Sequence, residues 1–215
     1  MLTNLDCELY PDLCEVAEMP LHSQWVYMIQ KNGTSSIRND PNNTYNILVN
    51  QEILDLDCVD VYIRNPKSRY VSGINTFVQH ILRDNPDLDQ DTLLWAATRY
   101  QFLNRHYLPQ ILWLVNLSRY LRSDAKLRIR NFRDYKDIML MNHDAEVIPP
   151  SASIKQKILS NTRDVELWFF ADKILLDLAG QQMTWTQLKN HYQTQHVDIW
   201  NNITSTARNI KHVLS

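Results

Sequence analysis

Residues 61–73 read VYIRNPKSRYVSG, and the hydrophobic pattern changes its period in the middle of this stretch. Before Arg64, the β-branched and aromatic residues Val59, Val61, Tyr62 and Ile63 predict a strand at 59–63. After Asn65 and Pro66, apolar residues recur at spacings of three and four, which predicts an amphipathic helix. Their positions are Tyr70, Ile74, Phe77, Val78, Ile81 and Leu82. Pro66 suits the first turn of that helix, because the N–H that proline lacks would have no partner there. The stretch therefore predicts a strand that leads directly into a helix.

The chain on either side of this stretch extends the same pattern. Further strands are expected at 25–29 and 45–49, behind an irregular first twenty residues. A helix is expected at 91–107 and ends before Pro109, whereas the short apolar segment 111–120 could be strand or helix. Beyond Pro149 and Pro150 the pattern is almost wholly helical, in the segments 151–160, 164–178, 184–192 and 202–214.

These elements predict an α/β fold in which a parallel β-sheet core is flanked by helices and the C-terminal half is largely helical. A length of 215 residues fits a single domain over 1–215. Its core is expected at about 24–120 and its helical remainder at about 121–215.

The composition excludes several classes of protein. Hydrophobic residues at 44% and charged residues at 21% are typical of a globular chain and not of a disordered one. The net charge of -2 argues against a general nucleic-acid binder, so any site for a polyanion is expected to be local. The three cysteines, Cys7, Cys14 and Cys58, contain no CxxC pair, which argues against a disulfide framework and a structural zinc site.

A membrane partner is not expected either. The longest apolar runs, such as 25–29, hold about five residues, whereas a membrane span needs about 20. The N-terminus is acidic and polar, unlike the basic start and apolar core of a signal peptide. The sequence therefore predicts a cytoplasmic protein.

Glycine is scarce in this chain. Only 3 glycines occur, where average usage of roughly 7% would give about 15. Gly180 is expected to end a helix. Gly73 falls inside the helix predicted after Pro66, where glycine costs about 1 kcal/mol relative to alanine. Close approach of a ligand or of a neighbouring strand would explain it.

A first candidate anion site lies at residues 27–38, YMIQKNGTSSIR. A strand runs into a loop with one lysine, one glycine and three successive hydroxyls, and a helix can begin at Ser35 or Ser36. The N–H groups and the dipole of a helix N-terminus bind anions, Gly33 would let the backbone approach, and Lys31 supplies positive charge. Because the lysine precedes the glycine, this is not the Walker pattern, which disfavours an ordinary P-loop ATPase. The alternative is a polar strand-to-helix turn capped by Ser35.

A second candidate anion site lies at Arg64 and Ser72. Arg64 follows the strand at 59–63, and open α/β sheets bind ligands at the carboxyl ends of their strands. Ser72 lies about two turns into the next helix, so the two side chains could hold a phosphate together. Lys67 and Arg69 stand where the helix dipole disfavours cations unless an anion is present. The alternative is an exposed basic helix start.

Together the two stretches resemble the nucleotide-binding motifs of sulfotransferases that use PAPS, 3′-phosphoadenosine 5′-phosphosulfate. In that family a PK-x-x-x-[ST]-like loop after the first strand binds the 5′-phosphosulfate. A later R-[DN]-P, with a serine eight residues after the arginine, binds the 3′-phosphate. Residues 30–36, QKNGTSS, match the first motif with Gln30 in place of proline. Residues 64–66, RNP, and Ser72 match the second. The resemblance implies a P-loop-like phosphate-binding turn.

The resemblance also implies a role for each matched residue. Lys31 would contact the bridging oxygen and the transferred sulfuryl group, while Arg64 and Ser72 would hold the 3′-phosphate. The loop that would bind the 5′-phosphosulfate consists of Lys31, Asn32, Gly33, Thr34, Ser35 and Ser36. A lysine and helix-terminus amides suit this reaction, because negative charge develops on the leaving phosphate. PAPS would be the donor and PAP, 3′-phosphoadenosine 5′-phosphate, the product.

A third motif supplies candidates for a general base. Residues 104–110, NRHYLPQ, resemble the H-[WYF]-x-P-Q segment of the carbohydrate-type branch of these enzymes. Transfer to a hydroxyl needs a base, and histidine titrates in the useful range, so His106 is the first candidate. The alternative is that His106 ends a helix and interacts with its last carbonyls. His80 and Glu52 are the next candidates.

No metal is expected. His191 and His196 are five residues apart, which does not place two ligands on one helical face, and no carboxylate pairs with them at metal-ligand spacing.

The expected function is transfer of a sulfuryl group from PAPS to a hydroxyl or amine of an acceptor, which could be a glycan or a small metabolite. The chain lacks the glycine-rich adenine-side loop of small-molecule sulfotransferases. It also lacks the cysteine pairs and membrane anchor of Golgi carbohydrate enzymes, which favours a compact cytoplasmic enzyme. Two alternatives stay open. A nucleotide-dependent phosphotransferase or kinase would need Mg²⁺ carboxylates near Lys31, where only Asp40 is available. A catalytically inactive nucleotide-binding interaction domain is the other.

Overall fold

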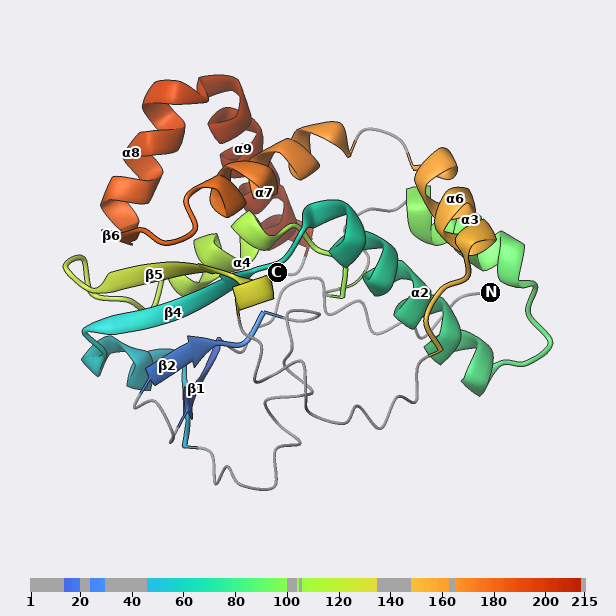
Figure 1. Ribbon diagram of the computed structural model, residues 1–215, viewed down its shortest axis with the longest axis horizontal. Helices are drawn as coiled ribbons and strands as arrows, with labels where there is room; N and C mark the ends of the chain where they lie inside the picture. Colours follow the sequence, from blue (N-terminus) through green and yellow to red (C-terminus); the bar gives the residue numbers. More distant parts are fainter. Residues whose placement is uncertain are drawn as a thin grey trace.

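The architecture comes from a computed structural model of the chain, drawn in Figure 1. The structure describes residues 14–19, 24–29, 46–99, 104, 106–134, 148–162 and 165–213, with side chains up to residue 207.

The described residues form a six-stranded sheet in the order β3-β1-β2-β4-β5-β6. The strands are β1 (Glu15–Met19), β2 (Gln24–Tyr27), β3 (Ile47–Val49), β4 (Cys58–Ile63), β5 (Lys126–Asn131) and β6 (Gln182–Thr184). In the centre, β4 is parallel to both β2 and β5. Toward the edges, β1, β3 and β6 run antiparallel to the strands they pair with. The prediction of an α/β fold with parallel strands at its centre is confirmed.

Helices connect the strands and make up most of the second half of the described chain (Figure 1). The helices are α2 (Pro66–Asp84), α3 (Gln90–Arg99), α4 (Gln110–Leu117), α6 (Ala152–Asn161), α7 (Glu166–Asp177), α8 (Trp185–Gln195) and α9 (Val197–Val213). Two short 3₁₀-helices are η2 (Asn50–Asp55) and η3 (Phe132–Asp134). The helical C-terminal half is confirmed, and α4 resolves the ambiguous segment 111–120 as a helix. Within the described ranges, no helix combines the length and the apolar character needed to cross a membrane.

Two elements differ from the sequence-based expectation at the N-terminal side. Strand β1 lies inside the stretch that the sequence predicts to be irregular. The helix predicted over 91–107 is wrong at its C-terminal end, because α3 ends at Arg99 and His106 and Tyr107 lie in a turn before α4. The alternative role for His106, as a helix-terminal residue, is therefore not what the structure shows.

Two further strands, β5 and β6, were not predicted from the sequence. In β5, leucine and isoleucine alternate with lysine and arginine, because one face of the strand meets the core while the other carries cations. Strand β6 has only 3 residues and leads directly into α8. It pairs with β5, so the helical half of the chain also contributes a strand to the sheet.

The main core lies between one face of the sheet and the C-terminal helices. Alternate residues of β4 and β5, such as Val61 and Ile129, are fully buried against α4 and α7. A second cluster joins α2, α3 and α6 around Ile74, Leu94 and Ile158. In Figure 1, α3 and α6 lie on one side of the molecule and α7, α8 and α9 on the other, and α2 runs between the two groups.

Candidate functional site

The two predicted phosphate motifs follow neighbouring parallel strands. Strand β2 pairs with β4 through Val26 and Asp60, so the carboxyl ends of the two strands lie at the same edge of the sheet. The described chain after β2 continues to Ile29, and Lys31 follows two residues later. The predicted loop residues Lys31, Asn32, Gly33, Thr34, Ser35 and Ser36 lie outside the described residues, as does the predicted P-loop-like turn.

Helix α4 is bonded to the carboxyl ends of both strands. The Tyr27 hydroxyl, on the last residue of β2, donates a hydrogen bond to the carbonyl of Trp113 over 3.0 Å. The side-chain amide of Gln110 pairs with the backbone of Arg64, directly after β4: Arg64 N–H donates to Gln110 Oε1, and Gln110 Nε2 donates to Arg64 O, both at 2.9 Å. The proline–glutamine end of the third motif therefore holds the arginine of the second.

Arg64 itself lies between the carboxyl ends of β4 and β5. Its guanidinium carbon is 5.9 Å from the ring centroid of Phe132, the first residue after β5, which is cation–π geometry. Partial burial of the side chain lowers the pKa of its guanidinium. A cation that is partly removed from water interacts more strongly with an anion than a fully solvated one does. This setting suits the anion-binding role expected of Arg64.

Asp172 of α7 in turn holds Gln110, which acts as a clamp on the backbone of Arg64. Its carboxylate accepts hydrogen bonds from the first two amides of α4, from Gln110 N at 2.8 Å and from Ile111 N at 2.9 Å. It also lies 3.3 Å from Gln110 Nε2. Burial raises the pKa of Asp172, and the hydrogen bonds from Gln110, the charge of Arg69 and the bond from Ile111 oppose that shift. A buried carboxylate thus caps α4 and fixes the orientation of Gln110.

Sequence reasoning did not single out Asp172. Its signal was an acidic residue within the strongly apolar run of α7, ELWFFADKILLD, on the buried face that also holds Trp168 and Leu175. Buried carboxylates are rare without a partner, so that position indicates a structural ion pair or cap.

Arg69 is a buried cation whose charge interacts with that of Asp172. It is 2% exposed, and its Nη1 donates to the carbonyl of Leu108 over 2.6 Å. Burial lowers the pKa of Arg69 to about 10, with Asp172 raising it and Arg64 lowering it further. Nearby, Lys67 Nζ lies 5.8 Å from the ring centroid of Phe169. Both cations have protein partners, so their place at the start of α2 does not by itself indicate an anion, contrary to expectation.

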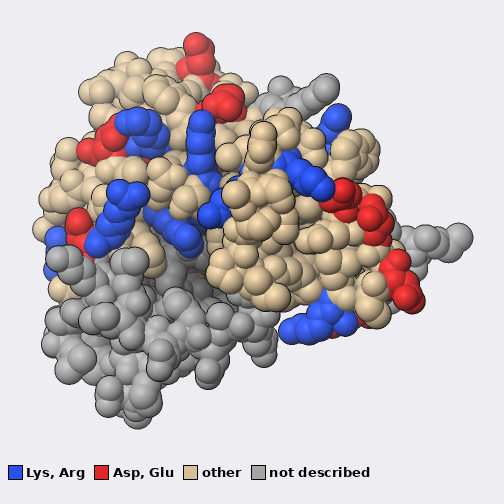
Figure 2. All heavy atoms as spheres, turned by 45° about the vertical axis from the view of Figure 1, so that its right-hand side comes forward, with Lys and Arg blue, Asp and Glu red and all other residues tan. Residues whose placement is uncertain are grey.

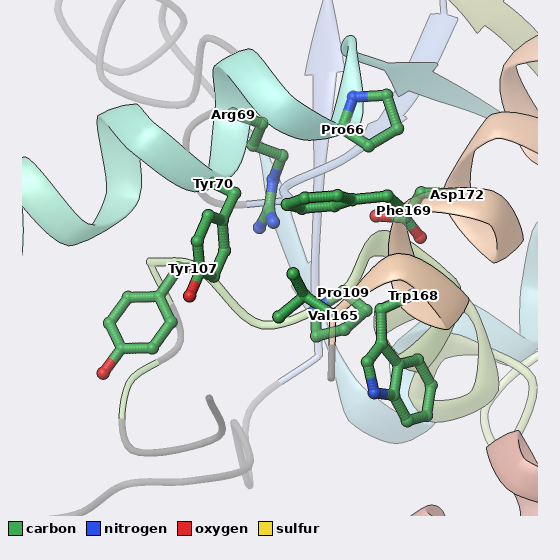
Figure 3. A pocket seen from close by; sticks show the side chains of 9 residues that line it. All are labelled: Pro66, Arg69, Tyr70, Tyr107, Pro109, Val165, Trp168, Phe169 and Asp172. Carbon is green, nitrogen blue, oxygen red and sulfur yellow. The ribbon is translucent and has the colours of Figure 1, made fainter. Parts of the chain in front are cut away.

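Arg69 and Asp172 both line a small cavity. Figure 3 shows Arg69 extending from α2 between Tyr70 and Phe169, with Asp172 entering from α7. The cavity measures about 20 Å³ and is lined by Pro66, Arg69, Tyr70, Tyr107, Pro109, Val165, Trp168, Phe169 and Asp172. That volume holds about one water molecule and no nucleotide. This cavity is therefore too small to be the nucleotide site.

Ser72 lies in the second turn of α2 and is half-buried. Helix α2 begins with Asn65 as its N-cap, whose Oδ1 accepts from Ser68 N at 3.0 Å. A helix rises 1.5 Å per residue, so Ser72 stands about 9 Å along the axis from Pro66. Arg64 and Ser72 thus come from the strand end and the helix that follows it, as the second motif requires.

Gly73 makes the closest packing contact in this region. A Cβ atom on Gly73 would lie 2.3 Å from the carbonyl oxygen of His106 and 2.8 Å from Tyr107 Cβ. Such a contact is far inside van der Waals distance, and the nearest atom is backbone. The glycine that the sequence left unexplained is thus required by the turn at 106–107, and not by a strand.

His106 is fixed by its own turn and by α2. Asn104 Oδ1 accepts from the backbone N–H of His106 at 2.9 Å and lies 2.5 Å from its Nδ1. The rings of His80 and His106 meet edge to face, with centroids 5.8 Å apart. Two of the three candidate bases therefore lie together. The third, Glu52, accepts from Val49 N at 2.8 Å and caps η2 on the surface.

Basic residues also gather on one face of β5. Arg128 and Arg130 both bind the buried carboxylate of Asp60 on β4, at 2.6 and 3.1 Å. Lys126 follows the same alternation, so β5 carries three cations toward the face opposite the main core. Figure 2 shows several Lys and Arg side chains grouped over the left and central part of one view, with further Lys, Arg, Asp and Glu side chains at its right-hand side. The described surface thus contains local basic regions despite the net charge of -2.

No family model, curated protein or solved structure matches this chain.

Proposed function

We propose that the protein is a sulfotransferase that moves a sulfuryl group from PAPS to a hydroxyl or amine of an acceptor, a glycan or a small metabolite. The observation that supports this best is the attachment of α4 to the ends of both β2 and β4. Tyr27 lies shortly before the first phosphate motif, and Arg64 is the first residue of the second. Both are hydrogen-bonded to residues of one helix, α4. If the two motifs bind anions, such bonding would give them a common support, as a nucleotide with two phosphate groups requires.

In the proposed reaction, each motif residue has a defined task. Arg64 and Ser72 bind the 3′-phosphate of PAPS, while the loop of Lys31, Asn32, Gly33, Thr34, Ser35 and Ser36 binds the 5′-phosphosulfate. An acceptor hydroxyl attacks sulfur, its O–S bond forms as the bond between sulfur and the bridging oxygen breaks, and PAP leaves. His106 takes the hydroxyl proton, and Lys31 stabilises the charge that develops on the leaving phosphate.

The first experiment compares thermal stabilisation by PAP with stabilisation by ATP and Mg²⁺. A ligand at 100 times its dissociation constant adds about 2.7 kcal/mol, which raises Tm by several degrees for a chain of this size. We expect PAP to raise Tm and ATP with Mg²⁺ to have little effect. A shift with ATP and Mg²⁺ alone would indicate a phosphotransferase instead.

Substitution of Arg64 tests the site directly. Because a hydrogen bond to a charged group contributes about 1.5–3 kcal/mol, we expect Arg64→Ala to weaken PAP binding by about 10- to 100-fold in calorimetry. The matched control is Arg83→Ala, which removes an exposed arginine from the last turn of α2, the helix that follows Arg64, and should leave PAP affinity unchanged. Equal PAP affinities for both variants would refute the assignment of Arg64. PAP binding without sulfuryl transfer to any of a panel of hydroxyl and amine acceptors would favour the inactive binding domain.

A further inference from the structure

We infer that Asn104 is a positioning residue that holds His106 in the tautomer with its proton on Nδ1, so that Nε2 carries the lone pair. This inference deepens the proposed function and rests on it, because it selects His106 from three candidate bases and names the group that prepares it.

The first step is the orientation of the Asn104 amide. One atom of that amide lies 2.9 Å from the backbone nitrogen of His106, and a backbone N–H is always a donor. The facing atom must accept, so it is the oxygen Oδ1 and not the NH₂ group. The backbone therefore fixes the orientation of the amide, which side-chain geometry alone would leave ambiguous.

The second step is the position of the imidazole proton. The same oxygen lies 2.5 Å from His106 Nδ1, and an amide oxygen has no proton to donate. A hydrogen bond between them requires the proton on Nδ1. In the neutral imidazole the other nitrogen, Nε2, then holds the lone pair. A proton acceptor in the reaction needs that lone pair.

The third step is the restriction of the ring. The backbone of His106 packs against Gly73 with no room for a Cβ atom, so α2 fixes where the side chain begins. The ring of His80, from the next part of α2, meets the imidazole of His106 edge to face at 5.8 Å. Asn104 and two positions of α2 therefore hold the imidazole of His106. A general base is typically oriented in this way by a further group.

Glu52 has a different structural task, because it is exposed and its carboxylate caps η2. His80 lies on α2 and contacts the ring of His106 edge to face. For His106, the hydrogen bonds to Asn104 show which group sets the tautomer.

The decisive experiment is ¹⁵N NMR of histidine-labelled full-length protein near neutral pH, with the His106 signals identified by their loss in His106→Gln. We expect the Nδ1–H tautomer for His106 in the wild type. In Asn104→Ala the signals should move toward the Nε2–H tautomer that imidazole favours in water, whereas Asn104→Asp should retain the Nδ1–H form. The control Asn85→Ala removes the C-cap amide of α2 and should change nothing at His106. A wild-type His106 with its proton on Nε2, or an unchanged tautomer in Asn104→Ala, would overturn the inference.

Kinetics provide the second readout. We expect Asn104→Ala to lower kcat for PAP release from PAPS, measured with a panel of hydroxylated acceptors, by on the order of 100-fold. The KM for PAPS should stay close to the wild-type value, and Asn104→Asp should restore most of the rate. Full turnover in Asn104→Ala would contradict the inference. A variant His80→Gln that loses turnover, together with a variant His106→Gln that keeps it, would contradict the inference too. If PAP fails to stabilise the protein, the proposed function fails, and the NMR arm still decides whether Asn104 sets the tautomer.

Discussion

At the scale of single residues, the described part of the candidate site depends on one close packing contact and one pair of hydrogen bonds. Gly73 allows α2 to approach the turn at His106, and Gln110 fixes the backbone of Arg64 with two hydrogen bonds. The sequence predicted roles for Arg64 and His106 from motifs. It could not identify Gln110 as the clamp, because the bond joins residues 46 positions apart.

Substitution of Gly73 should reverse the usual effect of alanine in a helix. Alanine is favoured over glycine by about 1 kcal/mol at an open helical position. At Gly73 a Cβ atom would meet the His106 carbonyl at 2.3 Å, so we expect Gly73→Ala to lower the free energy of unfolding by about 1–3 kcal/mol in urea titration.

The comparison variant is Gly180→Ala. Among the described residues, no atom lies within 4 Å of a Cβ atom built on Gly180, but its φ of +92° disfavours any L side chain. We expect a loss of about 1–2 kcal/mol there, from backbone strain alone. Stabilisation by Gly73→Ala would show that α2 and the turn do not approach as described.

At the scale of elements, helix α2 was predicted from its apolar spacing and from Pro66. Strand β5 was missed although its alternation of basic and apolar residues from Lys126 to Arg130 is a strand pattern. What the sequence could not show is its partner, because Asp60 on β4 binds Arg128 and Arg130. Such pairing depends on which strands are neighbours, and that information is not local in sequence.

Helix α4 should depend on Asp172 for stability. Removal of this carboxylate leaves two amides of α4 without their acceptor and removes a buried negative charge that interacts with Arg69. We expect Asp172→Ala to lower the free energy of unfolding by about 3–5 kcal/mol, measured by urea titration.

The matched control for that experiment is Asp177→Ala on the same helix. Asp177 is exposed and pairs with Lys173 one turn away, an arrangement that contributes about 0.3–0.5 kcal/mol. Similar losses for the two variants would mean that Asp172 does not hold α4.

At the scale of the whole molecule, burial sets the response to alkaline pH. Burial raises the pKa of Cys14 from 9.0 to about 12 and those of Tyr62 and Tyr70 from 10.0 to about 12. In the unfolded chain these groups lose their protons from about pH 9 to 10, while the folded chain retains them.

The folded state therefore binds more protons between about pH 9 and 12, and stability must fall as pH rises through that range. Each group contributes a slope of up to about 1.4 kcal/mol per pH unit. Urea titrations at several pH values should show this decline, and Cys14→Ala should reduce its slope above pH 9. A flat profile up to pH 11 would mean that these groups ionise equally in both states.

The bonds from Asp172 to Gln110 and from Gln110 to Arg64 have a consequence for the order of folding. They join residues 62 and 46 positions apart, and such distant contacts form late because long loops must close first. During synthesis, Arg64 leaves the ribosome long before α7 exists to secure its clamp. The nascent chain would thus order the backbone of Arg64 only after α7 has been translated.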